Sequence, residues 1–428
     1  MTHLVKRVST ETFRSLHIRN FRLFFTGQLI SQIGTWLTFV TQTLLVFKLT
    51  GSGVALGLLA AFQFGPVLLI GPWAGLIADR SDERRLLFVV QCGAMLKSFV
   101  LAALAFSGNP PVAAVFAVAL AGGVALAFDN PARRAFVVEM VPTEDVNNAV
   151  SLNSALMTGS RVVGPGLARQ LGHTRGVGWA FLGDGLSYLA VLAGLWLMNP
   201  AELRPSTPTP RAKGQVRAGL RYVRRVPDLW VPLVMMAVIG TLAFNFQVIF
   251  PLFATRDLDG TDTTFTLLFS VISLGSLVGA LATARRTSIT ISQVALAAVA
   301  FGLALVLMAV APTQAFAFPV GVLVGGASIA FMTASTSIVQ MRSDPTMRGR
   351  VLALQAMVFL GSTPIGGPLL GWICQQFGAR YGIALGAVGA IGAGLWGLAS
   401  VRRSDAAGRT QTEALPDGVD TGEVALVD

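Results

Sequence analysis

Cysteine and histidine are scarce in this chain. Its 428 residues include two cysteines, Cys92 and Cys374, both inside apolar runs, and three histidines, His3, His17 and His173, all outside them. Two distant cysteines build neither a disulfide framework nor a zinc cluster. Histidine, the commonest metal ligand and proton carrier near neutral pH, is missing from the apolar runs. The sequence therefore predicts no metal and no other cofactor.

Charge is also scarce. Only 12% of the residues are charged, 53% are hydrophobic and the mean hydropathy is +0.67, whereas soluble domains carry about 25% charged residues. The apolar residues form runs of roughly 20, the length that crosses a hydrocarbon core about 30 Å thick. The first run begins near Phe21 and is too long for a signal-peptide core, so we expect it to direct insertion itself. The composition predicts a polytopic membrane protein.

Twelve apolar runs are predicted to be transmembrane helices. A spanning segment must satisfy its own backbone groups in lipid, which a helix does within one segment. The runs do not show the alternating pattern of about ten residues that builds transmembrane β-barrels. The predicted spans are 21–47, 54–78, 86–107, 111–128, 150–171, 176–198, 229–254, 264–284, 289–311, 315–340, 351–374 and 381–400.

Lysine and arginine are distributed unevenly around these spans. If both termini are cytoplasmic, nearly all of the 32 Lys and Arg fall on the cytoplasmic side or inside a span. The outer side carries only Lys48, Arg169, Arg175, Arg256 and Arg380. This bias follows the positive-inside rule, so the net charge of +11 indicates membrane topology. We expect both termini to be cytoplasmic and no nucleic acid to bind.

Polar segments divide the chain into parts. Residues 1–20 form a cytoplasmic N-terminal segment whose "ETFRSLHIRNFR" mixes apolar and basic residues as an interfacial helix does. The linker 199–228 begins rich in Pro, Thr and Ser and continues as a basic helix. It separates a six-helix bundle at 21–198 from another at 229–400. The polar tail 401–428 is predicted to be a disordered cytoplasmic segment.

The two halves contain matching motifs. "GPGL" at 164–167 corresponds to "GPLL" at 367–370, and "GLIA" at 75–78 corresponds to "GALA" at 279–282. Both pairs have nearly the same separation and lie in corresponding spans, which indicates a six-plus-six duplication. Such duplications are typical of secondary transporters, which rock two bundles around a central site.

Several segments carry a resemblance to a known family. "GLIADRSDERRLL" at 75–87 resembles the signature between the second and third spans of the major facilitator superfamily. The segments 20–37, 128–170 and 181–189 resemble its drug and siderophore exporter branch, which includes macrolide efflux proteins, the enterobactin exporter and transmembrane secretion effectors. The resemblance implies an all-α membrane protein with twelve transmembrane helices in two six-helix bundles. It also implies a bacterial cytoplasmic-membrane exporter of hydrophobic or amphiphilic small molecules, driven by the proton gradient.

The resemblance further implies a conformational latch in the charged loop. Gly75 would let the second span approach the eleventh, because small residues permit close helix contact in lipid. Asp79 would face the N-terminal end of the eleventh span, where the helix dipole favours a carboxylate. Asp79 would also pair with an arginine at the end of the fourth span; the alternative is that these charges only mark a cytoplasmic loop. The implied latch residues are Gly75, Asp79, Arg80, Arg84, Arg133 and Arg134.

Three ionisable residues fall near the middle of predicted spans and are the candidates for proton coupling: Lys97, Arg161 and Asp184. A charge at the bilayer centre costs about 2.5–3.5 kcal/mol, so each residue needs a partner or a wet cavity. Asp184 is the only deep carboxylate and is therefore the first candidate for carrying a proton. Lys97 lies at a similar depth, so the two residues alternatively neutralise each other as a structural pair. Asp129 and Glu139, near the cytoplasmic mouth, are weaker proton-carrying candidates.

The fifth predicted span contains "GSRVVGPGLA", which resembles the antiporter signature of the superfamily. Its positions here are Gly159, Arg161, Gly164 and Pro165. Glycines in this region would let the fifth and eighth spans pack together, and the proline would bend the helix. In the family the region is associated with export, although packing of small residues is the simpler explanation.

The resemblance places the substrate cavity between the first, fourth, seventh and tenth spans. A largely apolar cavity with a few amides suits amphiphilic organic compounds, whereas a sugar importer needs denser polar clusters. The candidate cavity residues are Gln28, Gln32, Thr35, Trp36, Gln42, Phe244, Asn245, Gln247 and Phe331.

Enzymatic chemistry has no support in the sequence, which offers no nucleophile–base set and no phosphate-cradling loop. The predicted partners are a small-molecule substrate and the lipid bilayer, and the predicted state is a monomer. Two alternatives remain at this point: a nutrient importer of the same superfamily, and a non-transport membrane sensor on this scaffold.

Overall fold

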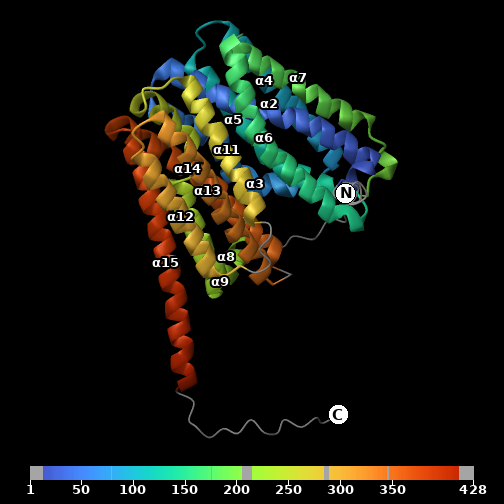
Figure 1. Ribbon diagram of the computed structural model, residues 1–428. Coiled ribbons are helices and arrows are strands. Elements are labelled where there is room, and N and C mark those ends of the chain that lie inside the picture. The colour runs from blue at the N-terminus through green and yellow to red at the C-terminus, as the bar shows by residue number, and fades with distance from the viewer. Residues whose placement is uncertain are drawn as a thin grey trace, which may run out of the picture.

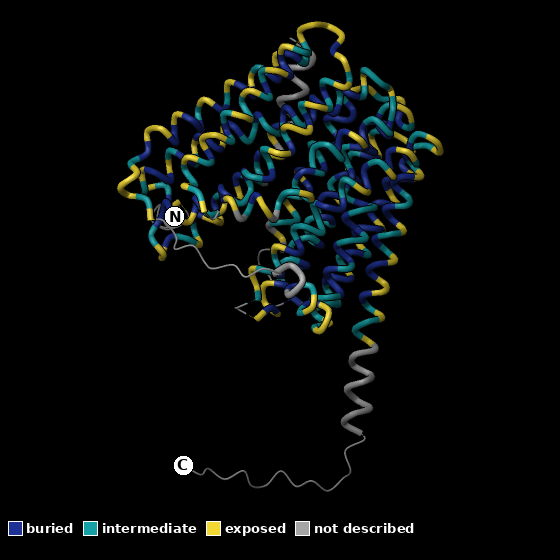
Figure 2. Tube along the Cα trace, turned by 180° about the vertical axis from the view of Figure 1, so that it is seen from behind, coloured by how far each residue is buried: buried dark blue, intermediate teal, exposed yellow. Residues whose placement is uncertain are grey.

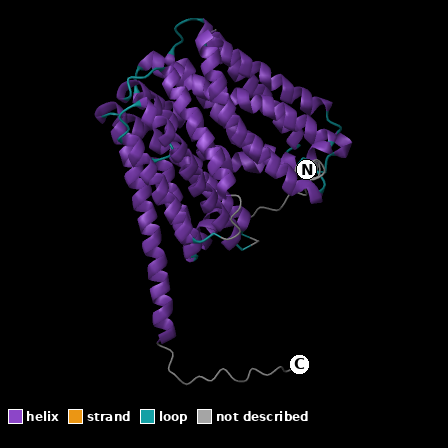
Figure 3. Ribbon diagram, in the orientation of Figure 1, coloured by secondary structure: helices purple, strands orange, loops and turns teal. Residues whose placement is uncertain are grey.

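The computed structural model describes residues 13–78, 80–174, 176–204, 215–283, 289–344 and 347–413. All regular secondary structure in these ranges is helical, as the sequence predicts (Figure 3). The elements are η1 (Arg14–His17), α2 (Arg19–Thr50), α3 (Gly53–Ala78), α4 (Glu83–Phe106), α5 (Val112–Glu139), η2 (Thr143–Asp145), α6 (Val146–Thr174), α7 (Val177–Leu197), η3 (Pro200–Glu202), α8 (Gln215–Arg225), α9 (Pro227–Leu242), α10 (Phe246–Leu252), η4 (Phe253–Asp257), α11 (Asp262–Thr283), α12 (Ile291–Ala309), α13 (Gln314–Arg342), α14 (Arg348–Phe377) and α15 (Ala379–Glu413).

Eleven helical segments of the described chain are long and apolar enough to cross a membrane. They coincide with eleven of the twelve predicted spans, the segment from α9 to η4 serving as one. The remaining predicted span, 150–171, corresponds to α6, which has 29 residues but carries Asn147, Asn148 and Asn153 near its start. It is not among the eleven. The protein is therefore a multi-pass membrane protein.

The helices form two groups. α2–α7, the N-terminal group, pack mainly on one another, and so do α9–α15, the C-terminal group. The main contacts between groups join α3 to α14 and α6 to α11. Figure 1 shows the two groups meeting at one end and diverging toward the other, where the described chain begins. Buried residues concentrate between the helices, and exposed ones follow their outward sides (Figure 2).

The contact between α3 and α14 depends on facing glycines. A Cβ atom on Gly53 would lie 2.5 Å from the carbonyl oxygen of Gly371, and Gly57 is similarly close to Gly367. Without side chains, the two backbones can touch. The sequence predicts contact between the second and eleventh spans but assigns it to Gly75. That residue lies about 27 Å beyond Gly57 along α3, at a rise of 1.5 Å per residue.

Two hydrogen bonds lie beside these glycines. The backbone N–H of Gly53 donates to Oε1 of Gln375 at 2.9 Å. Arg256, which follows α10, donates from Nη2 to the carbonyl oxygen of Gly51 at 2.5 Å. We call this region, residues 51–57 with 367–375 and Arg256, the closed end.

The N-terminal segment differs from the predicted interfacial helix. Its described part is a single 3₁₀ turn, η1, and a new helix begins at Arg19. The turn is held by polar contacts to the start of α6: Arg14 forms an ion pair with Asp145. The backbone N–H of Ser15 donates to Oδ1 of Asn148 at 3.0 Å. These contacts stop the helix because they use the side chains and backbone that a continuous helix would turn outward.

A second pair of contacts fixes the start of α2. The side chain of Asn20 donates to the carbonyl oxygen of Asn199 at 2.9 Å, and the N–H of Asn199 donates back to Asn20 at 3.0 Å. We call η1 and Asn20, with their partners, the N-terminal clip.

α5 is longer than predicted. It continues to Glu139, past the predicted end at 128, and therefore contains Asp129 and Arg133. The helix tolerates these charges because they face each other one turn apart, with Nη2 of Arg133 2.5 Å from Oδ2 of Asp129. Buried Phe136 continues its apolar face beyond the pair.

The predicted span 229–254 is interrupted. α9 ends at Leu242 and α10 begins at Phe246. At the break, Nδ2 of Asn245 donates to the carbonyl oxygen of Thr241 at 2.8 Å. This hydrogen bond takes the place of the backbone N–H donor that the carbonyl would have in a continuous helix. Periodicity alone does not reveal such a break, because the apolar run continues through it.

The structure describes parts of two segments predicted to be cytoplasmic, the linker 199–228 and the tail 401–428. The basic helix predicted in the linker is present as α8, whereas residues 205–214 lie outside the described chain. α15 extends to Glu413 and so includes residues 401–413 of the segment predicted to be disordered. This stretch contains no proline and many helix formers, which lets the last span continue as a helix. Residues 414–428 lie outside the described chain.

Candidate functional site

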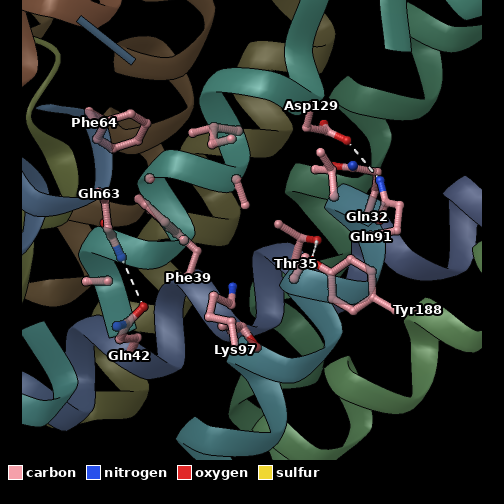
Figure 4. Close-up of a pocket in the computed structure, with 18 of the residues that line it drawn as sticks. Gln32, Thr35, Phe39, Gln42, Gln63, Phe64, Gln91, Lys97, Asp129 and Tyr188 are labelled. Carbon is pink, nitrogen blue, oxygen red and sulfur yellow. Dashed lines mark hydrogen bonds between the residues drawn. The ribbon is translucent and has the colours of Figure 1, made fainter. Parts of the chain in front are cut away.

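A cavity of about 160 Å³ lies among α2, α3, α4, α5 and α7, all in the N-terminal group (Figure 4). Three of its residues belong to charged types, one lysine, one aspartate and one arginine, and amide and hydroxyl side chains surround them. Phe39, Phe64, Val90 and Leu126 supply apolar walls. The polar lining consists of Gln32, Thr35, Thr38, Gln42, Gln63, Gln91, Lys97, Asp129, Arg133 and Tyr188.

The sequence identified only part of this lining. Gln32, Thr35 and Gln42 line the cavity as predicted. The other candidates do not line this cavity: Phe331 is fully buried, for example, and Asn245 is buried at the break before α10. The candidates outside the lining are Gln28, Trp36, Phe244, Asn245, Gln247 and Phe331.

The residues that the sequence analysis missed are mainly Gln63, Gln91 and Tyr188. Each is a polar side chain in the middle of an apolar run, on α3, α4 and α7 respectively. The resemblance directs attention to four spans and away from these three helices. An amide isolated within a membrane helix would have been a sufficient signal, because it needs a polar environment there.

Two hydrogen-bonded chains cross the lining (Figure 4). Gln42 donates to the carbonyl oxygen of Val115 at 3.4 Å and accepts from Nε2 of Gln63 at 3.1 Å. On the other side, Nε2 of Gln91 donates to Oδ1 of Asp129 at 2.8 Å. Asp129 also holds Arg133, so this carboxylate is neutralised within the cavity wall.

Lys97 and Asp184 are neighbours but not an ion pair. Their charges attract each other, yet no ion pair joins them in the described chain. Asp184 is fully buried outside the lining and accepts a hydrogen bond from Ser98 at 2.7 Å. Lys97 instead lines the cavity. The predicted structural pair is therefore present as an electrostatic attraction without direct contact.

Arg161 lies on the exposed side of α6, where its guanidinium is stacked 4.8 Å from the centre of the Trp36 ring. The glycines of the predicted fifth-span motif differ from each other. A Cβ atom on Gly164 would collide with Trp36 and lie 3.1 Å from the carbonyl oxygen of Ile33, whereas one on Gly159 would meet open space. Gly164 itself therefore packs against α2, and the predicted contact of this span with α11 occurs elsewhere along α6. Pro165 lies within α6.

The latch residues are only partly described. Asp79 lies outside the described chain, and Arg80 and Arg134 are exposed. Arg133 pairs with Asp129, as stated above. Arg84 donates from Nε to the carbonyl oxygen of Leu195 at 2.8 Å, so it stabilises the C-terminal end of α7 within its own group. A latch role for Arg84 across the two groups is not seen in this structure.

Comparison with known proteins gives matches along most of the chain. A family model described as "Transmembrane secretion effector" matches residues 10–419. The staphyloferrin A transporter of Staphylococcus aureus is 22% identical over 361 residues, covering 83% of this chain and 90% of that protein. Macrolide efflux protein A of Streptococcus pyogenes is also 22% identical, covering 83% of this chain and 89% of that protein.

Solved structures share the fold. A bacterial homologue of the human lysosomal transporter Spinster, in an inward-facing and occupied conformation, matches with a TM-score of 0.70 and 15% identity. That match covers 91% of this chain and 97% of the other. A POT family transporter in complex with a thioalcohol-conjugated peptide matches with a TM-score of 0.74 and 10% identity, covering 90% and 96%.

Proposed function

The chain belongs to the transmembrane secretion effector family of major facilitator superfamily transporters, and we propose that it exports hydrophobic or amphiphilic small molecules as a proton antiporter. The cargo would be a drug-like compound or a siderophore-like metabolite. Export is supported by the macrolide efflux relative, and a siderophore-like cargo by the staphyloferrin A transporter. Both are similar to this chain over most of their length.

The proposed topology has twelve spans in two six-helix bundles, with both termini on the cytoplasmic side of a bacterial inner membrane. Eleven spans coincide with the apolar helices, and α6 is the twelfth because it connects α5 to α7 across the same layer. Orientation rests on the excess of lysine and arginine in the loops assigned to the cytoplasm. We propose that the transporter works as a monomer, because a single chain supplies every residue of the cavity described above.

In this topology the closed end faces outward, so the structure represents an inward-facing state. Gly53 and Gly371 seal the outer side, and the groups diverge on the cytoplasmic side. We propose that Asp79, with Gly75 and an arginine of α5, joins the groups on the cytoplasmic side when the protein turns outward. Asp79→Asn would then reduce transport while leaving the amount of folded protein unchanged.

The observation that carries the transport proposal is the charged cavity itself. Lys97, Asp129 and Arg133 line it on two largely apolar helices, α4 and α5. A charge placed at the centre of a bilayer costs about 2.5–3.5 kcal/mol. A helix bundle that needed only stability would fill this space with apolar side chains. Polar groups around an open volume instead indicate a site for a transported molecule.

Two carboxylates compete for the proton. Asp184 is the candidate from the sequence, but it is sealed behind Ser98 and does not line the cavity. Asp129 lines the cavity and pairs with Arg133, so a proton and the Arg133 cation compete for it. We propose Asp129 as the coupling carboxylate, with Asp184 as the alternative and with Lys97 and Arg161 as cations that do not carry the transported proton.

The test is uphill transport into inside-out vesicles with an imposed proton gradient. The parent protein should accumulate a macrolide or a siderophore, and a protonophore should abolish the accumulation. An importer would instead transport in the opposite direction, and a sensor in neither. Transport in the opposite direction, or no proton-driven accumulation at all, would overturn the proposal of a proton antiporter.

The double variant Asp129→Asn, Arg133→Gln tests the coupling residue. Removing Asp129 alone leaves a buried arginine unpaired, which costs about 3–5 kcal/mol, whereas removing both charges avoids that loss. The double variant should fold and exchange substrate but should not accumulate it. Asp184→Asn is the comparison variant, and it should still accumulate substrate against its gradient. If the double variant accumulates substrate and Asp184→Asn does not, Asp184 is the proton carrier.

A further inference from the structure

The cavity holds one cation that forms no direct ion pair with a described residue. Asp129 and Arg133 pair with each other across 2.5 Å. Lys97 forms neither an ion pair nor a hydrogen bond with another residue of the described chain. Its stem passes over Gly122, where a Cβ atom would lie 3.0 Å from Cδ of Lys97. The glycine therefore leaves room for the Lys97 side chain beside the cavity.

Asp184 does not remove this positive charge from the cavity. It attracts Lys97, but it is fully buried and is not part of the lining. One of its oxygens accepts from Ser98, and Gly34 lies against the other, where a Cβ atom would be 2.6 Å away. Asp184 is thus held within the helix packing, and the ammonium group of Lys97 remains available to an anion that enters.

The amides add a second requirement. Because Gln42 donates to the carbonyl of Val115, its Oε1 must face Gln63, and this leaves Oε1 of Gln63 without a donor. Because Nε2 of Gln91 faces the carboxylate of Asp129, Oε1 of Gln91 also has no donor in the described chain. The partners fix both orientations, since an amide has donors on one side only. Buried acceptors of this kind normally have a partner.

We propose that this cavity recognises a carboxylate group with an adjacent hydroxyl or N–H donor, attached to an apolar body. Lys97 would bind the carboxylate, and the free amide oxygens of Gln63 and Gln91 would accept from the donor. Phe39 and Phe64 would pack against the apolar part. Figure 4 shows Lys97 between the Gln42–Gln63 contact and the Gln91–Asp129 contact. The inference rests on the proposed function and deepens it by naming the chemical class of cargo.

Three related compounds separate the two requirements: mandelate, phenylacetate and mandelamide. Phenylacetate lacks the hydroxyl, and mandelamide lacks the charge. Binding to the purified full-length protein in lipid nanodiscs is measured by titration calorimetry. A hydrogen bond to a charged group contributes enough for roughly a tenfold change in affinity, so mandelate should bind about tenfold more tightly than mandelamide. Phenylacetate should fall between them.

Variants assign the preferences to residues. Lys97→Met should remove the preference for mandelate over mandelamide, and Lys97→Arg should keep it. Gln63→Met and Gln91→Met should each reduce the preference for mandelate over phenylacetate. Lys48→Met is the matched control, because Lys48 is an exposed lysine at the end of α2 outside the lining. It should leave all three affinities unchanged.

Two results would overturn the proposal: equal affinity of the parent protein for mandelate and mandelamide, or an undiminished preference in folded Lys97→Met. The first needs no variant, so it stands even if a substitution prevents folding. These titrations use no gradient. Carboxylate binding without uphill transport would refute proton antiport alone, and proton-driven export of neutral compounds without carboxylate binding would refute this inference alone.

Discussion

Replacing Gly57 with alanine places a methyl group in the contact between α3 and α14. The new Cβ would lie 2.6 Å from Cα of Pro368 and closer still to the carbonyl oxygen of Gly367. Ordinary contact begins at 3.4 Å and the oxygen lies at 2.4 Å, so the two helices must separate by about 1.0 Å. Both clashing groups are backbone atoms, which have no rotamer that avoids the methyl group.

The magnitude follows from the same geometry. Inserting a methyl group into a packed contact costs about 1–3 kcal/mol. Because the contact exists only while the closed end is closed, the penalty applies to this state and not to its opposite. A difference of 1–3 kcal/mol changes the ratio of two states by about 5–150-fold. Gly57→Ala should therefore shift the protein strongly toward the state in which the closed end is open.

Double electron–electron resonance measures the shift between spin labels on Ser107, in the turn after α4, and Asp262, at the start of α11, which are both exposed. Cys92 and Cys374 are replaced by alanine and serine beforehand. The longer label-to-label distance should grow from a minor to a major component in Gly57→Ala. Gly65→Ala is the control, because a Cβ atom on Gly65, in the same helix, meets open space. If the two variants give the same distance distribution, the glycine contact does not set this equilibrium.

Three further predictions concern single positions. Gly164→Ala should lower the thermal unfolding temperature because its methyl group collides with Trp36, whereas Gly159→Ala should not; equal losses would contradict the packing on α2. Arg84→Gln should lower the unfolding free energy by about 0.5–1.5 kcal/mol, because its hydrogen bond to the Leu195 carbonyl is lost. Arg85→Gln, at an exposed position, should change the unfolding free energy little. Denaturant titration of the two variants compares these values. Asp184→Asn should tighten mandelate binding severalfold, because a negative charge that attracts Lys97 is removed, and weaker binding would show that Asp184 supports the site.

The sequence predicts the membrane helices well because lipid imposes a simple requirement. Every spanning segment must be apolar for about 20 residues, and this pattern is visible without tertiary information. The prediction loses accuracy where tertiary contacts replace lipid. α5 passes its predicted end because Arg133 neutralises Asp129, and α9 stops because Asn245 satisfies the freed carbonyl of Thr241. Neither event changes local hydropathy.

The candidate site was harder to predict than the helices. Gln32, Thr35 and Gln42 lie on the first span, which the family resemblance placed at the cavity. Gln63 and Gln91 come from different helices, and only packing brings them to the same cavity. Helix rotation decides which residues meet, and one sequence does not specify the rotation of an apolar helix whose sides are nearly equivalent.

The N-terminal clip has a consequence for how the protein is made. It joins Arg14 to Asp145 and Asn20 to Asn199, so all of its partners are synthesised before α9. At about 5–20 residues per second, the 200 residues from 229 to 428 take roughly 10–40 s to translate. During that interval the N-terminal group can insert and fasten its own two ends together. The C-terminal group then enters the membrane beside a partner that is already assembled, and the glycine surface of α3 is ready to receive α14.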